Sequence, residues 1–94
     1  MECRNISFTA HAFRRLVQRG ISPADVVSVV RHGEIVESYP EDVPRPSFLL
    51  LGHPSGKALH VLVSRDDGSG RCYIVTVYQP DPKLWRATFR KRQK

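Results

Sequence analysis

Four side chains in this sequence have the types needed to act on RNA: His11, Arg15, His60 and Tyr78. Cleavage of RNA without a metal needs a base for the ribose 2′-OH, an acid for the leaving 5′-oxygen, and a cation that stabilises the phosphorane. Histidine, tyrosine and arginine side chains provide these three functions. We therefore take these four residues as candidate catalytic residues of a metal-independent ribonuclease.

His11 is the first candidate for the base. It falls in the first turn of an expected helix, where the positive end of the helix dipole disfavours imidazolium and leaves a neutral base available. Arg14 and Arg15 follow at i+3 and i+4, so a guanidinium can hold a phosphate beside the imidazole. The alternative is that His11 only occupies an exposed helix end.

His60 and Tyr78 belong to two expected strands of one hairpin. His60 is expected on the strand face opposite Leu59 and Val61, and Tyr78 at the end of its strand. Whether they share a sheet face depends on the hairpin register, because a slip of one residue reverses the face. The structural alternatives are a satisfied core histidine and ordinary strand-end packing. Trp85 is expected to anchor a final helix in the core.

No metal site or cofactor is expected, because none of the four histidines has a Cys or His partner at ligand spacing. Cys3 and Cys72 are too few and too far apart for a disulfide framework, so we expect both thiols reduced and the protein cytoplasmic. No apolar run approaches the ~18 residues that span a bilayer.

The net charge of +6 is unevenly distributed. Residues 3–24 carry +4, residues 25–67 carry −3 and residues 68–94 carry +6. If the two basic ends meet in the fold, they form one cationic surface for a phosphate backbone. The alternative is a solvated surface that only maintains solubility. The expected RNA-binding residues are Arg14, Arg19, Arg86, Arg90, Lys91 and Arg92.

The apolar period changes from 3.6 to 2 at Gly33, which predicts helices followed by strands. Helices are expected over about 10–19 and from Pro23 to Gly33, and a third starting at Pro82. The expected strands are Glu34–Tyr39 at an edge, Ser47–Gly52, Lys57–Ser64 and Arg71–Tyr78. The expected core residues are Phe13, Leu16, Val26, Val30, Val61, Val63 and Ile74.

These elements predict a single α+β domain over residues 1–94, with a basic tail from about 90. We expect two N-terminal helices packed on an antiparallel sheet of three to four strands, and a short C-terminal helix.

Several segments resemble domain-of-unknown-function family 4258, over about residues 6–90. They are Ile6–Ala12 with Arg15, Arg19–Ser22 with Val26, Phe48–Gly52, Leu59–Val61, Ile74–Tyr78, and Pro80-Asp81 with Trp85. That family looks related to the BrnT and RelE-like toxins of bacterial toxin–antitoxin pairs, although Tyr78-Gln79-Pro80 stands where BrnT relatives carry a basic stretch.

The resemblance implies a RelE/BrnT-like fold and an endoribonuclease toxin that cleaves RNA by 2′-OH attack. Its implied partners are RNA and a cognate antitoxin protein, which could bind DNA. The alternative is a non-catalytic module that uses the same basic surface to bind nucleic acid or a protein.

Overall fold

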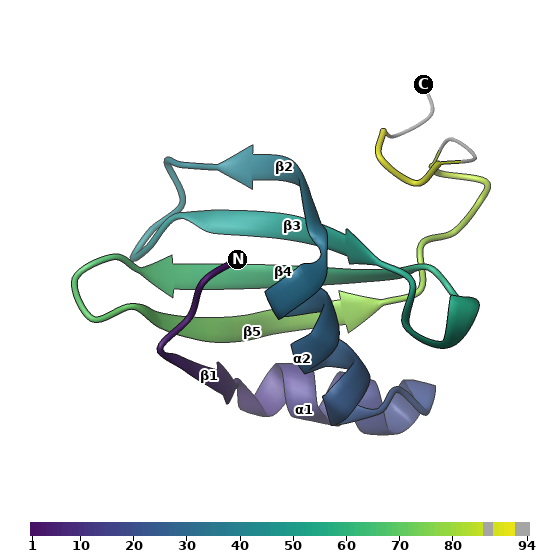
Figure 1. The fold of residues 1–94 in the computed structure, drawn as a ribbon, viewed down its shortest axis with the longest axis horizontal. Helices are drawn as coiled ribbons and strands as arrows, with labels where there is room; N and C mark the ends of the chain where they lie inside the picture. The colour runs from purple at the N-terminus through teal and green to yellow at the C-terminus, as the bar shows by residue number, and fades with distance from the viewer. Residues whose placement is uncertain (86–87, 92–94) are drawn as a thin grey trace.

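The computed structural model describes residues 1–85 and 88–91 of this chain. They form an α+β fold in which two helices accompany one five-stranded sheet of order β1-β5-β4-β3-β2 (Figure 1). In this part of the chain, no helix is long and apolar enough to span a bilayer. The elements are β1 (Asn5–Phe8), α1 (Ala10–Arg19), α2 (Pro23–His32), β2 (Glu34–Tyr39), β3 (Ser47–Gly52), a 3₁₀ turn (Pro54–Gly56), β4 (Leu59–Asp66) and β5 (Arg71–Tyr78).

Both N-terminal helices begin and end where the sequence predicts. The Thr9 hydroxyl accepts a hydrogen bond from the Ala12 N–H at 3.0 Å, and Gly20 ends α1 in the left-handed conformation with φ 64°. The Ser22 hydroxyl accepts from the Ala24 N–H, Pro23 occupies the first turn, and Gly33 follows α2. Local capping chemistry therefore fixes both helices.

Strands β2 to β5 form an antiparallel meander, as expected, with β2 at the edge. Alternation along the strands divides the side chains between two faces. Leu50, Val61 and Val77 pack with α1 and α2 in the core. We call the opposite side the distal face; it carries Leu49, Leu51, His60, Leu62, Thr76 and Tyr78.

The expected sheet of three to four antiparallel strands is wrong, because β1 adds a fifth strand. β1 pairs in parallel with β5, with Ile6 opposite Cys72 and Phe8 opposite Ile74, so the sheet is mixed. A four-residue strand with two apolar residues gives a weak pattern. Its partner is the last strand of the chain, so no hairpin signal points to it.

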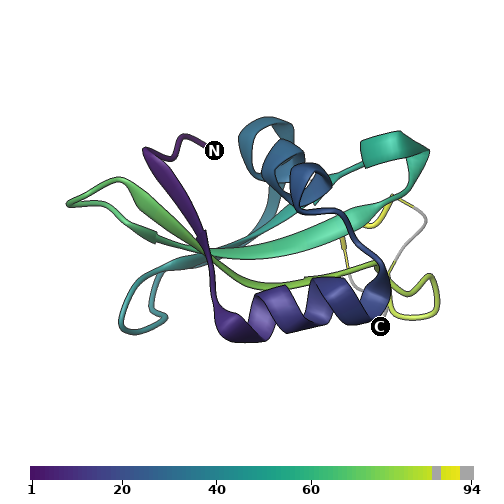
Figure 2. The ribbon, with the colours of Figure 1, turned by 90° about the horizontal axis from the view of Figure 1, so that it is seen from below.

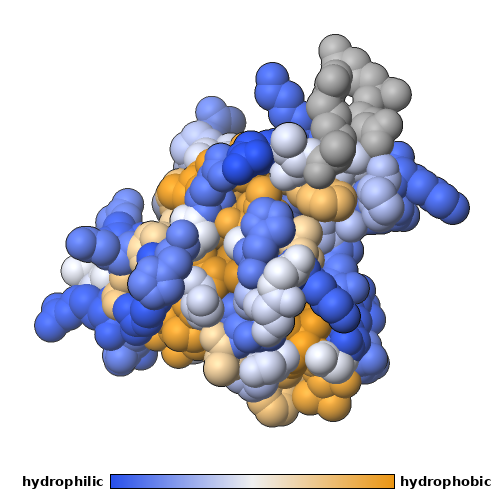
Figure 3. All heavy atoms as spheres, turned by 45° about the vertical axis from the view of Figure 1, so that its right-hand side comes forward, coloured by the Kyte–Doolittle hydropathy of each residue, from blue (hydrophilic) through white to orange (hydrophobic). Residues whose placement is uncertain are grey.

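The helices do not both cover one face of the sheet. α2 lies across β3 and β4, whereas α1 runs alongside β5 at the edge that β1 begins (Figures 1 and 2). α1 turns Ala12 and Leu16 inward, so Phe13, expected in the core, is 52% exposed and Val17 is 63% exposed. Hydrophobic residues accordingly reach the surface at the lower end of the molecule, where α1 lies (Figure 3). The other expected core residues are buried.

The expected C-terminal helix is also wrong: residues 79–85 and 88–91 contain none. Asp81 does cap one turn, since its carboxylate accepts from the Lys83 N–H at 2.8 Å and its carbonyl from the Trp85 N–H at 3.1 Å. The Trp85 side chain packs on His60 of the sheet and is only 2% exposed.

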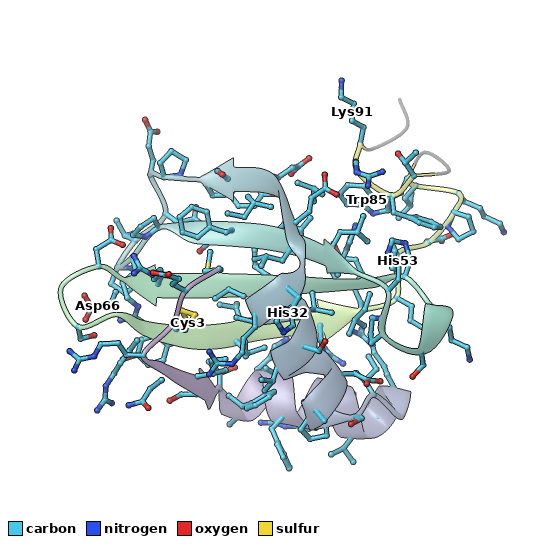
Figure 4. The ribbon with its side chains drawn as sticks, in the orientation of Figure 1. Cys3, His32, His53, Asp66, Trp85 and Lys91 are labelled. Carbon is cyan, nitrogen blue, oxygen red and sulfur yellow. A yellow bond between two sulfur atoms is a disulfide. The ribbon has the colours of Figure 1, made fainter. Side chains whose placement is uncertain are left out.

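The two cysteines form a disulfide, so the expectation of two reduced thiols is wrong. Cys72 lies on β5 and Cys3 precedes β1, the strand that the sequence pattern does not reveal (Figure 4). Parallel pairing of β1 with β5 brings the two Cα atoms within 5.7 Å. The disulfide therefore joins the first strand to the last.

Gly33 lies where the backbones of α2 and β3 approach too closely for a side chain. A Cβ at Gly33 would lie 2.4 Å from the Val29 carbonyl oxygen and 2.7 Å from the Leu51 carbonyl oxygen. We expect Gly33→Ala to lower the free energy of unfolding by about 3 kcal/mol in urea denaturation, because backbone atoms must shift. Gly68→Ala is the control: its nearest contact is 3.4 Å, so a change within about 0.5 kcal/mol is expected. Equal losses in the two variants would contradict the close approach.

Candidate functional site

His60 and Tyr78 lie directly opposite each other on β4 and β5, on the distal face. The His60 Nδ1 lies 3.2 Å from the Tyr78 hydroxyl oxygen. Their rings meet edge to face, with centroids 5.3 Å apart. The structure therefore brings these two candidate residues together, in a register that the sequence left open.

The hydrogen bond made by the other ring nitrogen of His60 determines which nitrogen carries the proton. Its Nε2 lies 2.9 Å from the Phe89 carbonyl oxygen. A carbonyl only accepts, so Nε2 carries the proton and, in the neutral ring, Nδ1 accepts from the Tyr78 hydroxyl. A hydroxyl, a base and a group that orients the base are the parts of an activated nucleophile or proton relay. Because His60 is fully buried, Tyr78 is the member of the pair that can meet a substrate.

The chain after β5 crosses the distal face above this pair. We call its described residues, 79–85 and 88–91, the C-terminal segment. The Trp85 ring packs edge to face on His60, with centroids 4.4 Å apart. Further along, the Arg90 Nε lies 2.8 Å from both carboxylate oxygens of Glu34, at the start of β2. This hydrogen bond lowers the pKa of the Glu34 carboxyl and raises the pKa of Arg90. The segment is therefore held at β4 and at β2.

A groove of about 380 Å³ lies on the distal face next to the C-terminal segment. Its volume is within the range of small-molecule sites, roughly 300–1,000 Å³. Leu49 and Leu62 supply aliphatic surface from neighbouring positions of β3 and β4. The other lining residues are Tyr39, Asp42, Thr76, Tyr78 and Trp85. Tyr78 and Trp85 thus belong both to the groove and to the surroundings of His60.

Residues 40–46, the loop between β2 and β3, border this face. The Asp42 N–H donates to the Tyr39 carbonyl at 3.2 Å, which folds the loop back at the groove. The Arg45 guanidinium lies 4.2 Å from the ring centroid of Tyr73, which faces the same side as Thr76 and Tyr78. The Arg45 Nε is buried and lacks a hydrogen-bond partner within the described structure. Buried donors are normally paired, so this atom is an exception.

The candidates on α1 lie elsewhere. His11 and Arg14 are exposed, and Arg15 is half-buried with its Nη1 3.2 Å from the Gln18 side-chain oxygen. The Arg19 guanidinium donates to the Val77 carbonyl on β5. No hydrogen bond found among the described residues joins His11 to the pair on the distal face. The structure thus groups His60 with Tyr78 and leaves His11 and Arg15 apart from them.

The two basic segments do not form one surface, contrary to our expectation. α1 lies along β5 and β1 at one edge of the sheet. Arg90 is tied to Glu34 on β2, the strand at the other edge, and Lys91 lies at the top of the molecule (Figure 4). Arg86 and Arg92, also expected to bind RNA, lie outside the described residues. The reason is topological, since the C-terminal segment crosses the whole sheet after β5.

Sequence reasoning missed Tyr39, Asp42 and Arg45. They come from the end of an edge strand and a proline-rich loop, where no periodicity indicates which side chains face the sheet. A carboxylate and an arginine three residues apart are the only available signal. Within the described ranges, no group of three His, Cys, Asp or Glu side chains could hold a metal ion.

Comparison with known proteins gives a family match. A family model described as "Domain of unknown function (DUF4258)" matches residues 8–79, from the end of β1 to just beyond β5. The searches of curated proteins and of solved structures each found no match.

Proposed function

Since the chain belongs to the DUF4258 family, whose description names no activity, we propose from its own residues that it is a metal-independent endoribonuclease. The observation that carries this proposal is the hydrogen-bonded series Tyr78, His60 and the Phe89 carbonyl beside a groove. The net charge of +6 supports a polyanionic substrate.

In the proposed reaction, the Tyr78 hydroxyl oxygen takes the proton of a ribose 2′-OH and passes its own proton to His60 Nδ1. The 2′-oxygen then bonds to phosphorus, and the bond from phosphorus to the 5′-oxygen breaks. The product is a 2′,3′-cyclic phosphate, and the departing 5′-oxygen takes a proton from water. The Phe89 carbonyl stabilises the imidazolium by accepting from its Nε2–H.

The biological setting that we propose is a type II toxin–antitoxin pair in the cytoplasm, related to BrnT and RelE-like toxins. Its support is the resemblance described above together with the small, basic chain. The partners would be RNA and a cognate antitoxin protein. A small acidic or DNA-binding reading frame beside the gene would favour this setting.

Growth and RNA analysis test the activity. We expect expression without a partner to arrest growth, and the purified chain to cut RNA in the presence of EDTA. The 5′ fragments should end in a 2′,3′-cyclic phosphate, identified by mass spectrometry. A chain that is harmless and leaves RNA intact would contradict the proposed ribonuclease.

A second function has one observation in its favour. His60 is fully buried and both of its ring nitrogens have partners, which is also the state of a structural histidine. The distal face would then bind nucleic acid or a protein without chemistry. RNA binding that weakens steeply with salt, with no cleavage, would favour this function.

A further inference from the structure

We propose that the groove on the distal face binds a single guanine base of an unpaired RNA strand. This inference rests on the proposed function only in taking RNA as the ligand; it does not require that the RNA be cut. It assigns to the groove a substrate preference, and to Asp42 and Arg45 the roles of reading the base and holding its phosphate.

The volume and the lining of the groove fit a single base. Leu62 offers aliphatic contact and Tyr39, 37% exposed, offers an aromatic ring, whereas Leu49 and Trp85 line the groove from buried positions. Aromatic side chains that stack unpaired bases are the usual means by which proteins hold single-stranded RNA. None of the lining residues is cationic, so the groove suits an uncharged ring rather than a phosphate.

Asp42 selects among the four bases, because an ionised carboxylate only accepts hydrogen bonds. Guanine presents two adjacent donors on its Watson–Crick edge, N1–H and the N2 amine, which match the two carboxylate oxygens. Adenine and cytosine place an acceptor beside their amine, and uracil has one donor between two carbonyl groups. The carboxylate therefore favours guanine.

Arg45 lies on the same face and can bind the phosphate next to that base. Its guanidinium is held over the Tyr73 ring, 4.2 Å from the centroid, and the residue is partly exposed. A phosphate oxygen would bind this partly exposed guanidinium, with the geometric preference of guanidinium for phosphate. Base and phosphate would thus be bound by one loop, residues 40–46, together with the sheet.

Binding of non-cleavable RNA tests the inference separately from catalysis. The probes are labelled 2′-O-methyl uridine heptamers with G, A, C or U at the centre, whose methyl groups block 2′-OH attack. By fluorescence anisotropy at one salt concentration, we expect the full chain to bind the G heptamer about tenfold or more tightly than the others. Asp42→Asn should remove this preference. Glu41→Gln, which removes a charge from the same loop outside the groove, should retain it.

Each outcome has one meaning. Equal affinity for the four heptamers, no binding, or an unchanged preference in Asp42→Asn would overturn the inference. Selective binding of the G heptamer without cleavage of natural RNA would refute the ribonuclease and leave the inference standing. Cleavage of natural RNA without selective binding of the G heptamer would support the ribonuclease and refute the guanine-binding inference.

Discussion

Tyr78→Phe is expected to lower the single-turnover rate of RNA cleavage by about 10²–10⁴-fold, the usual contribution of a general base. The substitution removes only the hydroxyl that faces His60 Nδ1 at 3.2 Å and keeps the ring in place. Loss of one hydrogen bond costs about 1 kcal/mol, so the variant should remain folded. Cleavage kinetics and circular dichroism on the same preparation separate the two effects.

His11→Ala is the matched comparison, because His11 was the first candidate from the sequence and lies on α1, apart from Tyr78. His11 is exposed, so its removal should change stability by less than about 0.5 kcal/mol. If His11→Ala abolishes cleavage and Tyr78→Phe does not, the active site is on α1, and Arg15→Ala should then also reduce the rate. If only Tyr78→Phe is inactive, the site is on the distal face.

Reduction of the Cys3–Cys72 disulfide should lower the free energy of unfolding by about 4 kcal/mol, from the loop-entropy relation for a long closed loop. The two residues are separated by 69 positions, so the link restricts most of the unfolded chain. Urea denaturation with and without a phosphine reductant measures the difference on one and the same sequence.

Cys3→Ser without reductant provides the control, and it should have the stability of the reduced chain. Cys3 is the better position to change, since Cys72 is fully buried in the core. Identical stability with and without reductant, or two free thiols by titration without reductant, would contradict the disulfide.

Local signals in the sequence predicted the parts of the fold that depend on local chemistry. Thr9, Ser22 and Pro23 define helix starts by hydrogen bonds and fixed dihedrals within a few residues, and the strands of the meander are joined by short loops. β1, the position of α1 and the disulfide depend instead on a parallel contact between the two ends of the chain. No local pattern encodes that contact, and the exposed Phe13 is a direct consequence of it.

The candidate site likewise contains residues that the sequence could indicate and residues that only the fold brings together. His60 and Tyr78 could be selected by residue type, but their pairing required the register of β4 with β5, which a bulge at Leu62 and Val63 alters midway. Asp42 lines the groove and Arg45 lies over Tyr73 only because the loop folds toward the distal face. Trp85 was expected to be an anchor, and it is one, but for the distal face rather than for a helix in the core.

The exposed edge of β2 bears on whether copies of this chain associate. An unpaired edge offers its backbone groups to a strand of another molecule, which is a route to aggregation. Here the strand has a bulge between Ile35 and Glu37, and it carries two carboxylates, Glu34 and Glu37, over six residues. Because Arg90 neutralises Glu34, the bulge and the Glu37 carboxylate are the features that make continuous pairing between copies costly. The open edge of β2 is thereby protected against fibre-like growth.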